Sequence, residues 1–142
     1  MLSTVAVGTD GSATASKAVE AAAEIARLFG AKLVLLSAAQ RSRDPSAGLS
    51  ESSEELQWTF NKSARLRMML DRTEQDLRNR KIDCRTMLDE GDPADVLIRL
   101  AEECDADLLV IGNRGMHRRV LGSVPNTVTH KAGCSVYVVK TT

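Results

Sequence analysis

Apolar and polar residues follow two different periodicities along the chain. Five short runs are rich in apolar or β-branched residues and are bounded by turn residues, which is the pattern of β-strands. In the stretches between them, apolar residues recur every three or four positions, as in amphipathic helices. The strand runs are residues 4–8, 32–38, 83–88, 108–111 and 135–139. This alternation predicts an α/β fold: a single doubly wound domain over residues 1–142, with a five-stranded parallel sheet and helices on both faces.

The composition of the strands predicts their places in the sheet. The run Leu33–Leu36 contains no polar residue, which is typical of a strand covered by helices on both faces. The run 108–111 has the same character, and we expect it to be the central strand. The more polar run 83–88 suits a sheet edge, where one side meets water.

Capping signals mark the first and third predicted helices. Residues 10–12, Asp-Gly-Ser, precede the first helix, and Gly30 ends it. Asp92 and Pro93 start the third helix, as its N-cap and its first residue. The apolar stripes of these helices are expected at Ala18, Ala22, Ile25 and Phe29, and at Ala94, Leu97, Ile98 and Ala101.

The second and fourth helices have weaker end signals. A long helix is predicted over 54–80, after a loop at 39–53 that is rich in Ser, Arg and Glu. Charged residues cover all but one of its faces, so we expect it to be half exposed. Its apolar stripe is Leu66, Leu70 and Leu77. The fourth helix is predicted from Ser123 to Ala132, with Gly133 ending it.

The composition narrows the class of protein. Nineteen basic and nineteen acidic residues give a formal net charge of zero, so no electrostatic footprint for nucleic acid or an anionic membrane is present. No apolar run reaches the roughly 18 residues of a membrane span. The three cysteines lack Cys-x-x-Cys spacing and indicate reduced thiols, and two histidines do not suggest a metal site. We expect a soluble, cytoplasmic protein that contacts neither nucleic acid nor membrane.

A glycine-rich loop follows the predicted strand 108–111. Gly112, Gly115 and Gly122 allow close approach of a ligand to the backbone, and a helix starting near Ser123 has N–H groups without intrahelical partners. Such donors bind phosphate well. Ser123 either caps the helix or donates its hydroxyl to a phosphate. A glycine after a strand also occurs in ordinary turns, so the phosphate-loop interpretation depends on the rest of the chain.

The same loop carries positive charge. Arg114, His117, Arg118 and Arg119 either contact phosphate or form a solvated surface, and of these Arg114 lies inside the glycine motif. Neither His117 nor His130 has a serine or cysteine nucleophile at a recognisable motif spacing. No catalytic residue is therefore predicted.

Three parts of the chain resemble the universal stress protein family, and the resemblance spans the full length. They are residues 5–12 (VAVGTDGS), 91–93 (Gly-Asp-Pro), and 109–115 (LVIGNRG) continued through 122–124 (GSV). The resemblance implies the Rossmann-like fold of that family. Its ATP-binding branch has the motif Gly-x2-Gly-x9-Gly-(Ser/Thr), whereas the spacer 116–121 in this chain has six residues.

The resemblance also implies an adenine-nucleotide site. The implied cofactor is ATP, with AMP and cyclic AMP as alternatives and Mg²⁺ carried with the nucleotide. Asp10, beside Thr9, would lie near the ribose, and the backbone of Ala38 would meet the adenine. The residues implied in phosphate binding are Gly112, Arg114, Gly115, Gly122, Ser123 and Val124. A homodimer is implied through Val136–Val139, an apolar edge that would otherwise be exposed.

Two acidic residues have a structural alternative to ligand binding. Asp10 either contacts the ribose or a phosphate-bound metal, or stabilises the Asp-Gly-Ser turn before the first helix. Asp92 is best explained as an N-cap, although it also follows a strand near the predicted site.

Three functions fit the sequence. The first is a stress-response regulator or sensor that binds an adenine nucleotide. The second is a slow ATPase, for which the chain offers neither a Walker lysine nor a pair of catalytic carboxylates. The third is a nucleotide-free dimeric adaptor of the same family, which the six-residue spacer favours.

Overall fold

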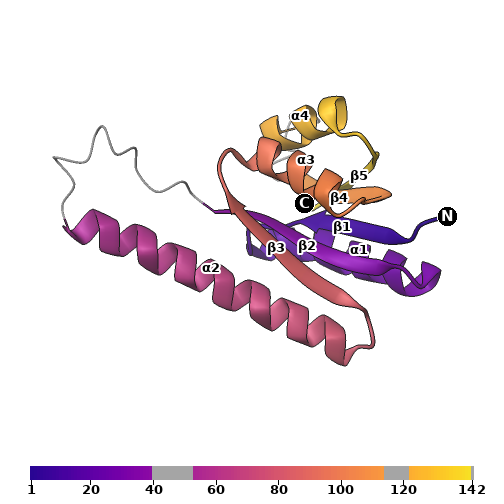
Figure 1. Ribbon diagram of the computed structural model, residues 1–142, viewed down its shortest axis with the longest axis horizontal. Coiled ribbons are helices and arrows are strands. Elements are labelled where there is room, and N and C mark those ends of the chain that lie inside the picture. Colours follow the sequence, from indigo (N-terminus) through magenta and orange to yellow (C-terminus); the bar gives the residue numbers. More distant parts are fainter. Residues whose placement is uncertain (40–52, 114–121, 142) are drawn as a thin grey trace.

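The computed structural model describes residues 1–39, 53–113 and 122–141, which form a single parallel sheet flanked by helices (Figure 1). The strand order is β3-β2-β1-β4-β5, and all four neighbouring pairs are parallel. The elements are β1 (Thr4–Gly8), α1 (Ala13–Phe29), β2 (Lys32–Ala39), α2 (Ser53–Asn79), β3 (Cys84–Glu90), α3 (Pro93–Glu103), β4 (Leu108–Asn113), α4 (Ser123–Lys131) and β5 (Ser135–Lys140). The predicted α/β fold is confirmed, and the polar strand β3 lies at an edge as expected.

The centre of the sheet is β1, not β4. β1 pairs with β2 on one side and with β4 on the other, so the prediction that 108–111 is the central strand was wrong. An apolar strand indicates that helices cover both faces of the sheet at that strand. β4 shares this property with β1, so its apolar run does not determine its position in the strand order. The chain runs outward through β2 and β3 and then returns to the other side of β1. The carboxyl ends of β1 and β4 therefore flank the switch point where such sheets hold ligands.

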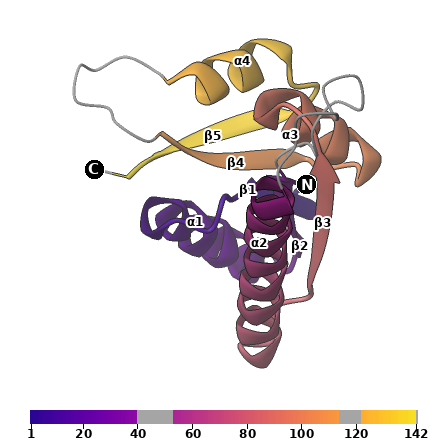
Figure 2. The ribbon, with the colours of Figure 1, turned by 90° about the vertical axis from the view of Figure 1, so that its left-hand side faces the viewer.

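Each face of the sheet has its own core. α1 and α2 cover one face, and α3 and α4 cover the other (Figure 2). The first core includes Val5, Val7, Leu33 and Leu77, and the second includes Leu36, Leu97, Leu109 and Val128. Val5 and Val7 face one side of β1 while Ala6 faces the other, as the alternation of a strand requires.

Helix α1 begins and ends where the capping signals predict. Ser12 is the N-cap, and Gly30 ends the helix in the left-handed conformation at φ 64°. Phe29 was predicted on the buried stripe, but 59% of its surface is exposed. The chain turns at Gly30 and places Ala31, not Phe29, in the core.

Helix α3 has the expected start, and α4 begins at Ser123 as predicted but has a different cap at each end. Asp92 accepts the N–H of Asp95 at 3.2 Å, which confirms its N-cap role. In α4 the N-cap is Gly122, so the interpretation of Ser123 as a cap was wrong and Ser123 is the first helical residue. The helix ends at Lys131 with an extended C-cap, and Gly133 does not take the left-handed conformation that was expected to end it.

The long helix α2 packs by one stripe against the first core. Leu70 and Leu77 are buried and Leu66 is half-buried, as predicted. In the described ranges every helix is too short or too polar to span a bilayer. All three cysteines are free thiols, and burial raises the pKa of Cys84 to about 12.

Candidate functional site

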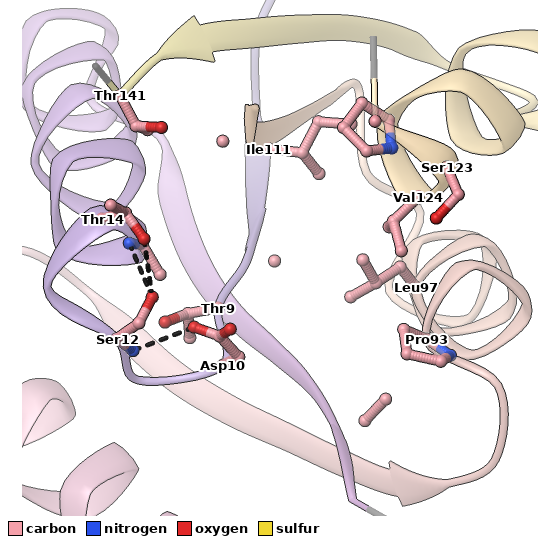
Figure 3. Close-up of a pocket in the computed structure, with 16 residues that line it drawn as sticks. Thr9, Asp10, Ser12, Thr14, Pro93, Leu97, Ile111, Ser123, Val124 and Thr141 are labelled. Carbon is pink, nitrogen blue, oxygen red and sulfur yellow. Dashed lines mark hydrogen bonds between the residues drawn. The ribbon is translucent and has the colours of Figure 1, made fainter. Parts of the chain in front are cut away.

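A cavity of about 380 Å³ opens at the switch point, between the carboxyl ends of β1 and β4 (Figure 3). The turn into α1 forms one wall, and the start of α4 with the first part of α3 forms the opposite wall. Seven of the residues predicted for the site line it: Thr9, Asp10, Ala38, Gly112, Gly122, Ser123 and Val124. The other two, Arg114 and Gly115, lie outside the described residues, as do His117, Arg118 and Arg119.

The wall at the β1–α1 turn is built by short side chains that bind backbone N–H groups. Thr9 Oγ1 accepts the N–H of Gly11 at 3.1 Å, and Asp10 Oδ1 accepts the N–H of Ser12 at 2.9 Å. Ser12 Oγ in turn accepts the N–H of Ala15 at 3.1 Å. The structural alternative for Asp10 is therefore present: its carboxylate stabilises the turn. The same side chain is exposed and lines the cavity, so the turn role leaves room for a ligand role.

A buried hydroxyl supports this turn from β2. Ser37 is 0% exposed, and its Oγ donates to the carbonyl oxygen of Thr9 at 2.7 Å. The N–H of Thr9 donates to the carbonyl of Leu36 at 2.9 Å. The sequence placed this end of the second strand, Ser37 to Ala39, near the adenine but did not predict that Ser37 supports the turn, although a serine in an otherwise apolar strand was a signal.

An apolar wall faces the turn across the cavity. Pro93 and Leu97 of α3, with Ile111 of β4, line this side. A Cβ at Gly8 would lie 2.9 Å from a methyl group of Leu97, so a glycine lets α3 sit close to the end of β1. An apolar surface beside polar groups suits a ligand with a flat base at one end and hydroxyls at the other.

The start of α4 supplies hydrogen-bond donors. Ser123 and Val124 are first-turn residues, whose N–H groups have no partner inside the helix, and Pro125 has no N–H. The N–H of Gly122 is not available, because it donates to Asn113 Oδ1 at 3.0 Å. Two backbone donors and the Ser123 hydroxyl therefore belong to residues that line the cavity at this end.

The residue after β5 completes the cavity and was missed by sequence reasoning. Thr141 is 3% exposed and donates its hydroxyl to the carbonyl of Asn113 at 3.0 Å. Its own carbonyl accepts the ammonium of Lys17 at 3.0 Å. A Cβ at Gly112 would lie 3.0 Å from Thr141 Cγ2, so this glycine accommodates a protein side chain. Nothing in the local sequence around Thr141 indicates this contact.

The described lining of the cavity carries little charge. Among the lining residues that the structure describes, Asp10 is the charged one. His130 lies in the last turn of α4, is exposed, and does not line the cavity. Within the described ranges no group of three His, Cys, Asp or Glu side chains is placed to hold a metal ion. The arrangement offers hydroxyls, free N–H groups and an apolar wall, which are means of binding.

Comparison with known proteins identifies the family. The model of the universal stress protein family matches residues 1–140. The chain belongs to the universal stress protein family. A universal stress protein of Mycobacterium tuberculosis is 35% identical over 145 residues, covering 98% of this chain and 97% of that protein. A universal stress protein of Methanocaldococcus jannaschii is 32% identical, covering 96% of this chain and 81% of that protein.

Solved universal stress proteins share the fold. A crystal structure of a universal stress protein in complex with cyclic AMP is 32% identical, with a TM-score of 0.77 and 99% of each chain covered. A protein of the family from Burkholderia pseudomallei is 28% identical with the same TM-score, covering 97% of this chain and 96% of that chain. These likenesses agree with the fold described above.

Proposed function

We propose that this universal stress protein binds an adenine nucleotide in the cavity between β1 and β4 and acts as a stress-response regulator. The observation that carries the proposal is the cavity itself, where a hydroxyl-lined turn, an apolar wall and the open first turn of α4 converge at the switch point. The cyclic AMP complex of the relative that is 32% identical over 99% of both chains supports the ligand class.

Each wall suits one part of the nucleotide. The backbone of Ala38 would border the adenine, and Pro93 and Leu97 would cover it from the apolar wall. Thr9 and Asp10 would meet the ribose hydroxyls. The N–H groups of Ser123 and Val124, with the Ser123 hydroxyl, would hold the phosphate. Further phosphate contacts from Arg114 and Gly115 remain predictions.

The donors at α4 favour a ligand with one phosphoryl group. Gly122 was expected to contribute to phosphate binding, but its N–H is bound to Asn113, which leaves two backbone donors and one hydroxyl. Asp10 adds negative charge to the described lining, and four charges of a triphosphate would need to be balanced by Mg²⁺ or by cations. We therefore rank AMP and cyclic AMP before ATP, which the sequence had placed first.

Calorimetric titration of nucleotide-stripped protein tests the proposal. The ligands are AMP, cyclic AMP, ATP with Mg²⁺, and adenosine, and the denatured protein is checked for nucleotide carried through purification. We expect micromolar binding of AMP or cyclic AMP and weaker binding of ATP. Absence of binding by all four would refute the proposal and favour the nucleotide-free adaptor. Release of phosphate from ATP at a steady rate would instead support the slow ATPase.

We also propose that the chain forms a homodimer through β5. β5 is an edge strand, Tyr137 is 43% exposed, and Val136 and Val138 are half-buried. An unpaired apolar edge of this kind favours pairing with a second copy. Light scattering with size-exclusion chromatography measures the mass, and a variant at the exposed position of β5, Tyr137→Lys, is expected to be monomeric. The free thiols support the cytoplasmic location predicted from the sequence.

A further inference from the structure

One buried side chain ties the start of α4 to the end of β4. Asn113 is the last residue of β4 and is 0% exposed. Its Oδ1 accepts the N–H of Gly122, the N-cap of α4, at 3.0 Å. Its backbone carbonyl accepts the hydroxyl of Thr141, also at 3.0 Å. The first turn of α4 is therefore anchored to the sheet through a side chain, because Gly122 itself has none that caps the helix.

The side-chain nitrogen of Asn113 is relevant to the question why this residue is an asparagine and not an aspartate. Nδ2 of Asn113 is buried and has no hydrogen-bond partner among the described residues. A flipped amide would turn its N–H groups toward the N–H of Gly122, so the orientation is fixed. Aspartate would offer the same acceptor without the unpaired donor, but a carboxylate buried at this position would itself cost more than the unpaired N–H.

Asparagine is neutral and aspartate is charged, and this difference affects the binding of an anion at the start of α4. Its bond partner Gly122 and the next residues Ser123 and Val124 line the cavity at the end where a phosphate would bind. A carboxylate at this place would repel an anion held by the same helix turn. An amide supplies an acceptor without that repulsion.

We propose that Asn113 is a positioning residue for the phosphate: it fixes the first turn of α4 with an uncharged acceptor. This inference rests on the proposed function. By occupying the N–H of Gly122, Asn113 holds the neighbouring N–H groups of Ser123 and Val124 toward the cavity. It does so without contacting the ligand, so its removal should affect the phosphate and spare the base and ribose.

The test compares Asn113→Ala, which removes the acceptor, with Asn113→Asp, which keeps it and adds charge. Asn126→Ala and Asn126→Asp are matched controls, because Asn126 lies in the same helix and is exposed. Calorimetry measures the affinities for AMP, cyclic AMP and adenosine. Hydrogen exchange by NMR measures the protection of the Gly122 amide in the unliganded protein.

The two variants should fail in different ways. Asn113→Ala should lose protection at Gly122 and bind AMP and cyclic AMP about tenfold more weakly, the effect of one lost hydrogen bond. Asn113→Asp should keep the protection and still lose about tenfold or more. Its affinity for cyclic AMP, whose phosphodiester stays charged, should return as the pH is lowered and the introduced carboxyl is protonated. Both should bind adenosine within about twofold of the parent, and both Asn126 variants should leave all affinities nearly unchanged.

Several results would overturn the inference. An equal loss for adenosine and AMP would show a merely structural role, and parental AMP affinity in Asn113→Asp would refute the argument from charge. If Asn113→Ala does not fold, Asn113→Asp carries the test, because it keeps the acceptor for Gly122. If the parent binds none of the ligands, the proposed function fails instead. Gly122 protection still tests the anchor, and unchanged protection in Asn113→Ala would refute it.

Discussion

The turn that carries Thr9 and Asp10 depends on the buried hydroxyl of Ser37. Replacing Ser37 by alanine removes the donor that the Thr9 carbonyl receives at 2.7 Å and leaves that oxygen unpaired. An unpaired buried acceptor costs about 1–3 kcal/mol. Because Thr9 is itself half-buried, water can reach part of it, and we expect the lower part of that range, about 1–2 kcal/mol.

Urea denaturation measures this loss against a matched control. Ser16 also donates its hydroxyl to a carbonyl, that of Ala13 at 2.6 Å, but it is exposed on α1. Ser16→Ala should change the free energy of unfolding by no more than about 0.5 kcal/mol, because water replaces the lost partner and alanine favours a helix. For a chain of this length, Ser37→Ala should lower Tm by about 3–10 °C.

The functional effect of Ser37→Ala should differ from that of the Asn113 variants. The turn lies on the ribose side of the proposed site, so a looser turn should weaken adenosine and AMP to the same extent. Equal urea midpoints for Ser37→Ala and Ser16→Ala would refute the structural argument. A loss confined to AMP would refute the assignment of this wall to the ribose.

Three further predictions concern the turn, the amino end of the sheet and the thiols. Gly11 and Gly30 have φ 80° and φ 64°, so Gly11→Ala and Gly30→Ala should each lower the free energy of unfolding by about 1–2 kcal/mol through left-handed strain, which urea denaturation measures. A Cβ at Gly11 would also meet the end of the Met69 side chain, but that flexible end can move aside at little cost, so the two variants should differ little. Two N–H groups at the start of the chain hold the pKa of Asp107 below its usual range, so its contribution to stability is present above the unfolded pKa and is lost as the pH falls through the folded one. Asp107→Asn should therefore lower stability at pH 7 and flatten the acid side of the stability profile, which thermal scans from pH 2 to 7 measure. Burial raises the pKa of Cys84 to about 12, so a thiol reagent at pH 8 should modify it only on unfolding, and mass spectrometry across a urea series checks this.

The fold could be predicted because its signals are local. Capping by Ser12 and Asp92 and the apolar run of β2 each depend on a few neighbouring residues, and parallel strands then require helices between them. The order of strands depends on pairing across the chain, such as Val5 with Leu108, which no local pattern contains. The prediction that β4 is central failed for this reason.

The site could be predicted only where it follows a strand directly. Thr9 and Gly112 come at or beside strand ends, so the parallel sheet brings them together. Ser37 and Thr141 act through hydrogen bonds to residues 28 positions away in the sequence. Their identity as short polar residues does not reveal those partners. Sequence reasoning therefore found the two loops and missed the side chains that hold them.

Gly112 and Gly122, the first and last glycines of the phosphate-loop motif, lie in different surroundings. Gly112 faces Thr141 and Ala18, so a side chain there would meet the protein before it met a ligand. Gly122 has φ −62°, which any residue adopts, and its N–H is bound by Asn113. Neither a left-handed backbone nor a free donor explains a glycine at 122, although this residue lines the cavity. The first glycine of the motif therefore meets a packing requirement, and the last has no free N–H to offer, so the number of glycines does not measure the number of phosphate donors.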